Sequence, residues 1–198
     1  MKTKEEKSKI CAFAACILIV LGSIPYLWKN LTGAIHPNAS SWLIFAFIGV
    51  LNATSYKKLT GDWVKSVFPT VNTLILLLTT ALVLRKGSFG NLGAVDVCCL
   101  IFGILAALVW WIFKKKESAP ALVQVILEIG AFIGFIPTIL ATAHDPSREF
   151  WLAWFLWSCS FYLQFLTVKY TWKGNWVDFL FPLNRMALNG IVFVLALR

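Results

Sequence analysis

Residues 61–69 read GDWVKSVFP, and residues 174–182 read GNWVDFLFP. A second pair of segments is separated by nearly the same distance along the chain. GSIP at residues 22–25 matches GFIP at residues 134–137. We infer that a segment of about sixty residues occurs twice, around an unmatched middle segment.

The composition is typical of a protein embedded in a membrane. Hydrophobic residues make up 59% of the chain and charged residues 14%, whereas an average soluble domain has about a quarter charged residues. Seven apolar stretches each approach the roughly 20 residues that a helix needs to cross a bilayer. The expected helices are residues 10–28, 41–57, 65–84, 91–113, 121–142, 149–168 and 176–197.

These observations predict an all-α membrane protein, in which seven transmembrane helices form two parallel three-helix repeats joined by a linker helix. A repeat of three helices reverses the direction of the chain, so the unmatched fourth helix is needed to give both repeats the same orientation. Repeats of this kind are typical of transporters, which bind substrate between them. The expected parts are a cytoplasmic N-terminal tail (1–9), the first three-helix repeat (10–85), linker helix 4 (86–118) and the second three-helix repeat (119–198).

Positive charge is concentrated on one side of the expected membrane. Twelve lysines lie on the side of the N-terminus and five basic residues on the other, so the positive-inside rule places the N-terminus in the cytoplasm. We therefore expect an integral multi-pass protein of a bacterial inner (plasma) membrane, with membrane lipid as a partner and no basic face for nucleic acid. The oligomeric state stays open. The twelve are Lys2, Lys4, Lys7, Lys9, Lys57, Lys58, Lys65, Lys114, Lys115, Lys116, Lys169 and Lys173, and the five are Lys29, Arg85, Lys86, Arg148 and Arg198.

Two charged residues are expected deep in the membrane. Glu128 in the fifth helix and Arg185 in the seventh lie roughly 12–15 Å from the cytoplasmic ends of their helices, at about 1.5 Å per residue. An isolated charge at this depth costs several kcal/mol, so each should face the interior and find a partner, which the equal depth allows to be the other. Three roles are open: proton coupling through Glu128, binding of a substrate carboxylate or phosphate by Arg185, or a structural ion pair.

Prolines recur at matched positions of the repeated segment. Pro25 and Pro137 lie late in the first and fifth helices, where a proline removes a backbone hydrogen bond and bends the helix. They are candidate hinges for alternating access, and static kinks are the alternative. Pro69 and Pro182 are expected in the first turns of the third and seventh helices, where proline is tolerated.

The proline late in the first helix of each repeat, followed by a short loop and a tryptophan that begins the next helix, resembles the SWEET and PQ-loop superfamily. In that family the element reads Pro-Gln, and here it reads Pro25-Tyr26 and Pro137-Thr138. The resemblance covers almost the whole chain and rests on the 3+1+3 helix topology more than on any motif. It implies transport of a small solute through a central cavity.

The resemblance also implies substrate-binding residues. In SWEET-like proteins an asparagine on each of the third and seventh helices bonds the substrate, and a tryptophan on the sixth lies near it. Asn72 matches the first asparagine, and Asn184 is the nearest candidate for the second. Trp157, beside Ser158, is the candidate tryptophan. Neutral amides suit a polyol or amide substrate, and hydrogen bonding between helices is the alternative role.

Other function classes lack the residues that they need. The sequence has no Ser/His/Asp grouping, Gly-rich phosphate loop or metal-spaced His/Cys set, so we expect neither an enzyme nor a cofactor. His36 and His144 are too few for a metal site, and the last helix has no lysine for retinal. The sequence favours a transporter or facilitator that moves a small polar solute, sugar-like or another small metabolite, by alternating access. The alternative is a non-transporting membrane receptor, chaperone or scaffold with the same fold.

Overall fold

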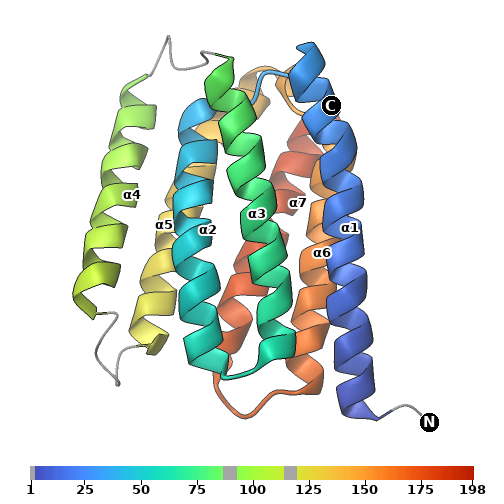
Figure 1. Ribbon diagram of the computed structural model, residues 1–198. Helices are drawn as coiled ribbons and strands as arrows, with labels where there is room; N and C mark the ends of the chain where they lie inside the picture. The colour runs from blue at the N-terminus through green and yellow to red at the C-terminus, as the bar shows by residue number, and fades with distance from the viewer. Residues whose placement is uncertain (1–2, 87–92, 114–119) are drawn as a thin grey trace.

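The structure, a computed structural model, describes residues 3–86, 93–113 and 120–198, and every regular element in these ranges is a helix (Figure 1). Seven helical segments are long and apolar enough to cross a membrane, which confirms the predicted number. The α-helices are α1 (Lys4–Thr32), α2 (Ala39–Thr60), α3 (Trp63–Arg85), α4 (Ala94–Phe113), α5 (Pro120–His144), α6 (Trp151–Tyr170) and α7 (Leu180–Ala196). Two short 3-10 helices, η1 (Pro146–Arg148) and η2 (Trp176–Phe179), precede α6 and α7.

Local capping residues set where the first three helices begin. α1 starts at Lys4, well before the expected residue 10, because the side chain of Thr3 caps it. Asn38 and Asp62 cap α2 and α3 in the same way, and both helices begin two residues before the expected position. Pro69 consequently lies inside α3 and not in its first turn, so that expectation was wrong.

The helices pack as an elongated bundle with the two termini at opposite ends (Figure 1). α3 contacts both α1 and α2, and α7 contacts both α5 and α6. The two groups meet where α1 packs against α6 and α2 packs against α5. α4 lies at one side, against α2 and α5. We call the end that holds the N-terminus the N-terminal end of the bundle, and the opposite end the C-terminal end.

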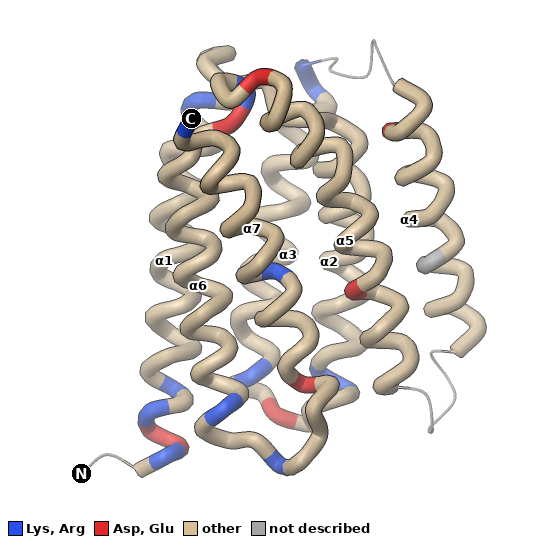
Figure 2. The backbone as a smooth tube through the Cα atoms, turned by 180° about the vertical axis from the view of Figure 1, so that it is seen from behind, with Lys and Arg blue, Asp and Glu red and all other residues tan. Residues whose placement is uncertain are grey.

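Charged residues gather at the two ends of the bundle (Figure 2). Large hydrophobic side chains are exposed along the helices, and Phe13 is 70% and Trp28 67% exposed. Glu128 is the single acidic residue of α5, and Arg185 is the single basic residue of α7. Four lysines of the expected charge distribution, Lys2 and Lys114 to Lys116, lie outside the described residues.

Candidate functional site

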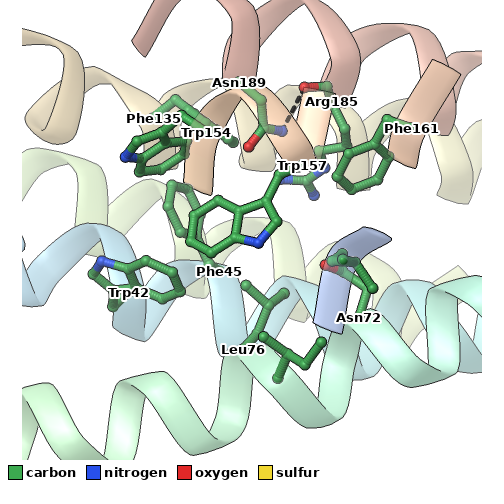
Figure 3. A pocket seen from close by; sticks show the side chains of 12 residues that line it. Trp42, Phe45, Asn72, Leu76, Phe135, Trp154, Trp157, Phe161, Arg185 and Asn189 are labelled. Atoms are coloured by element: carbon green, nitrogen blue, oxygen red, sulfur yellow. Dashed lines mark hydrogen bonds between the residues drawn. The ribbon is translucent and has the colours of Figure 1, made fainter. Parts of the chain in front are cut away.

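A small cavity lies inside the bundle, between α1, α2 and α3 on one side and α5, α6 and α7 on the other (Figure 3). About 30 Å³ of it is open to a water-sized molecule. Six of its twelve lining residues are aromatic, three are aliphatic and three are polar. The lining residues are Ile19, Trp42, Phe45, Asn72, Ile75, Leu76, Phe135, Trp154, Trp157, Phe161, Arg185 and Asn189.

Aromatic side chains pack between the cavity and the C-terminal end of the bundle. The ring of Tyr26 lies 5.4 Å from that of Trp42 and 4.9 Å from that of Trp157, between centroids. The rings of Trp154 and Trp157 are also 4.9 Å apart. The indole N–H of Trp157 donates to the hydroxyl of Ser23 at 3.1 Å, which joins α6 to α1. Packed aromatic rings therefore occupy the bundle interior on this side of the cavity.

A buried carboxyl group accepts hydrogen bonds from two of these aromatic side chains. Glu149 lies just before α6 and is 6% exposed. Its Oε2 accepts hydrogen bonds from the Tyr26 hydroxyl at 2.8 Å and from the Trp154 indole N–H at 2.9 Å. Burial raises the pKa of Glu149 from its ordinary value of 4.5 to about 7, although both hydrogen bonds act in the opposite direction. The charge of this group therefore changes near neutral pH.

The pKa of Glu149 predicts a pH-dependent stability. A carboxyl group whose pKa is raised in the folded state contributes stability that is fully present below pH 4.5 and is lost as pH rises through about 7. The shift corresponds to about 3 kcal/mol. We expect the wild type to lose up to this amount of unfolding free energy between pH 4.5 and pH 8, relative to Glu149→Gln. Denaturant unfolding of both proteins at several pH values measures the difference, and identical pH profiles would contradict the prediction.

Phenylalanine and tyrosine rings pack between the cavity and the N-terminal end of the bundle. The centroids of Phe68 and Phe161 are 5.0 Å apart, and Phe181 lies 5.4 Å from both Phe161 and Tyr56. All four side chains are buried. Phe68 and Phe181 occupy aligned positions of the repeated sequence segment. Packed rings therefore occupy the bundle interior on this side of the cavity also.

A buried ion pair lies beyond these rings, nearer the N-terminal end. The Nζ atom of Lys65 is 3.3 Å from Oδ2 of Asp178, and the two side chains are 1% and 5% exposed. The two residues occupy aligned positions of GDWVKSVFP and GNWVDFLFP. Lys65 was counted among the basic residues on the N-terminal side of the expected membrane, and the structure places it near that end but with its ammonium group buried against the other half of the chain.

Two prolines leave the backbone carbonyls of this ion pair without their helical donors. A proline at position i has no N–H for the carbonyl at i−4, which is Lys65 for Pro69 and Asp178 for Pro182. The Gln164 amide donates to the Lys65 carbonyl at 2.8 Å, and the Tyr56 hydroxyl donates to the Asp178 carbonyl at 2.7 Å. Each carbonyl is thus bonded by a side chain from the other half of the chain, which ties the two halves together at this end.

The polar side of the cavity comes mainly from α7. Arg185 and Asn189 are one helical turn apart and so lie on the same face, and the Asn189 amide donates to the Arg185 carbonyl at 2.6 Å. The Arg185 guanidinium carbon is 5.9 Å from the centroid of the Phe135 ring. Asn72, from α3, faces the cavity from the other side (Figure 3). Its side chain makes no hydrogen bond to a described residue.

Glu128 lies beside Arg185 and is held by three amide groups. Its Oε1 accepts from Asn52 at 2.8 Å and from Gln124 at 3.0 Å, and its Oε2 accepts from Asn184 at 2.9 Å. The Nε atom of Arg185 is 3.6 Å from Oε2, which is an ion-pair distance and not a hydrogen bond. The expected partnership between the two charged residues is therefore observed, with amides between helices supplying the hydrogen bonds.

The sequence-predicted residues fall into two groups. Asn72, Trp157 and Arg185 line the cavity together. Asn184 does not line it and instead bonds Glu128. Ser158 donates to the Met186 carbonyl at 3.0 Å and joins α6 to α7. The hinge candidates Pro25 and Pro137 lie inside α1 and α5, toward the C-terminal end.

Sequence reasoning missed several residues of this site. Asn189 lines the cavity where Asn184 was expected, and its spacing of four residues from Arg185 was the available signal. Trp42 and Trp154 also line the cavity, although nothing in the sequence assigned them to it. Asn52 and Gln124, which bond Glu128, carried no pattern that distinguishes them from other polar residues in apolar helices.

Comparison with models of protein families, with curated proteins and with solved structures finds no match to this chain.

Proposed function

We propose that this protein is a membrane-embedded transporter or facilitator of a small polar solute, working by alternating access between two three-helix bundles. The observation that carries the proposal is the central cavity between the two groups of helices, with Asn72, Arg185 and Asn189 facing it from the two sides. Buried aromatic rings pack toward both of its ends, and a central site between two bundles is what alternating access requires.

The packing of the helices supports two repeats of parallel orientation. In two equivalent repeats, α1 corresponds to α5, α2 to α6 and α3 to α7. The contact of α1 with α6 then has the contact of α5 with α2 as its equivalent, and both contacts exist. The aligned residues Phe68 and Phe181, and likewise Lys65 and Asp178, meet across the same boundary. Contacts between equivalent positions are expected at a two-fold axis along the membrane normal.

The surface supports insertion in a membrane. Seven apolar segments of sufficient length, with exposed hydrophobic side chains along them, match the dimensions of a bilayer. Lysines near the N-terminal end favour a cytoplasmic N-terminus in a bacterial inner membrane. Lys65 contributes nothing to this argument, because it is buried.

Flux through reconstituted vesicles tests the function. Proteoliposomes containing the protein should take up one class among sugars, amino acids, nucleosides and carboxylates faster than empty vesicles. We expect Asn72→Ala to raise the solute concentration needed for half-maximal uptake about tenfold, through loss of one hydrogen bond. Thr54→Ala, an exposed polar change on α2, is the matched control and should leave uptake unchanged.

The alternative is a receptor, chaperone or scaffold that binds in the same cavity without moving the solute. Binding of a solute to the purified protein, without flux of any class above that of empty vesicles, would support this alternative and exclude transport.

A further inference from the structure

Building on the proposed function, we infer that the solute is a small organic monoanion of the carboxylate type, with an apolar body, and that the guanidinium group of Arg185 binds its anionic end. Three features of the molecule support this inference: the hydrogen bonds that Glu128 already accepts, the unused donors of Arg185 and the composition of the cavity wall.

The carboxylate of Glu128 accepts its hydrogen bonds from side-chain amides and not from Arg185. Amide N–H groups from α2, α5 and α7 already donate to its two oxygens at 2.8, 3.0 and 2.9 Å. A buried carboxylate with three such donors has most of its hydrogen-bonding capacity used. Glu128 balances the charge of Arg185 from 3.6 Å without occupying its N–H groups.

Arg185 therefore keeps its donors for another acceptor. None of its guanidinium N–H groups donates a hydrogen bond to a described residue, and its Nε is buried without an acceptor. The side chain is 5% exposed and lines the cavity. A guanidinium group presents a planar fork of N–H donors that matches the two oxygens of a carboxylate. A buried guanidinium group that lines a cavity and has unused N–H donors is suited to bind an oxyanion there.

The rest of the cavity selects the body of the solute. Arg185 is the single charged side chain among the described residues that line it, and Asn72 and Asn189 are the polar ones. Six aromatic rings and three aliphatic side chains make up the remainder. A polyol needs a hydrogen-bonding partner for each hydroxyl, and two amides beside apolar walls supply too few. A small solute with one charged end and an apolar body therefore matches the lining of this cavity.

Matched acids and amides test the anion. Benzoate and benzamide have the same shape, as do propionate and propionamide, and each pair differs in charge. Binding to the purified protein is measured by quenching of tryptophan fluorescence, since Trp42, Trp154 and Trp157 line the cavity, and by thermal stabilisation. We expect an acid to bind about 30-fold more tightly than its amide, the range for a hydrogen-bonded charged pair. Glucose should bind no better than the amides.

Variants of Arg185 test whether this residue binds the anionic end of the acid. Arg185→Gln should weaken binding of the acid about 30-fold and leave the amide unchanged, and Arg185→Lys should have an intermediate effect because a lysine lacks the fork. Thr54→Ala is the control. Equal binding of acid and amide, failure of every acid to bind, or an Arg185→Gln protein that binds acid like the wild type would overturn the inference. If Arg185→Gln does not fold, the comparison of acid with amide in the wild type decides alone.

The same measurements separate this inference from the proposed function. Selective binding of acids without flux supports the anion site and excludes transport. Flux of a neutral solute that Asn72→Ala slows, with no preference for acids, supports transport and overturns the anion site.

Discussion

Asp178→Asn is expected to lower the free energy of unfolding by about 3–5 kcal/mol, because it leaves the ammonium group of Lys65 buried without a counter-charge. Lys65 is 1% exposed and lies 3.3 Å from the carboxylate that the substitution removes. An asparagine oxygen can still accept a hydrogen bond, but it does not balance the charge. Denaturant unfolding of the purified protein in detergent measures the loss.

Three further variants show whether the ion pair is the cause. Lys65→Met combined with Asp178→Leu removes both charges and should recover most of the stability. Exchanging the two residues, Lys65→Asp with Asp178→Lys, should recover part of it, because the aligned positions have similar surroundings. Glu5→Gln breaks an exposed ion pair with Lys9, which solvent screens, and should leave the stability nearly unchanged. If Asp178→Asn is as mild as Glu5→Gln, Lys65 is not buried in the native protein.

Glu128→Gln is expected to destabilise the protein by about 3 kcal/mol or more. The new amide nitrogen replaces an oxygen that accepts a hydrogen bond, and Arg185 loses the negative charge 3.6 Å from it. The substitution thus produces both an unsatisfied donor and an uncompensated buried cation. Thermal or denaturant unfolding, compared with the wild type under the same conditions, gives the magnitude.

A double-mutant cycle isolates the coupling between the two residues. Glu128→Gln combined with Arg185→Gln removes both charges, so the double variant should be more stable than the sum of the two single effects indicates. Glu5→Gln again serves as the exposed control. Additive effects of the two substitutions would mean that the charges do not interact, and that the amides alone account for the burial of Glu128.

The depth of a residue along its helix could be predicted from the sequence, whereas the direction in which its side chain points could be predicted only in part. Glu128 and Arg185 were placed at one depth by counting residues at a fixed rise, and they do lie together. Asn184 and Asn189 differ by five residues on α7, yet the first bonds Glu128 and the second lines the cavity. Which of them faces the cavity depends on the rotation of α7 against α5 and α6, and no local pattern encodes that rotation.

Lys65 shows a different failure. The sequence analysis only counted Lys65 with the other basic residues on the N-terminal side, and no local pattern marks it as buried. Its burial depends on Asp178, more than a hundred residues later in the chain, and on the polar groups that Pro69 and Pro182 leave to be satisfied. Lys65 and Asp178 occupy aligned positions in the sequence, but only their contact in the structure identifies them as an ion pair.

The sequence by itself determined the seven helices and the repetition of a segment, because hydrophobic length and self-similarity are local or one-dimensional properties. The tertiary structure decided which polar groups meet: three amides around Glu128, free donors on Arg185, and the ion pair of Lys65 with Asp178. The physical reason is that a buried polar group takes whichever partner the packing of helices brings within hydrogen-bond distance. That packing is set by apolar surfaces from distant parts of the chain.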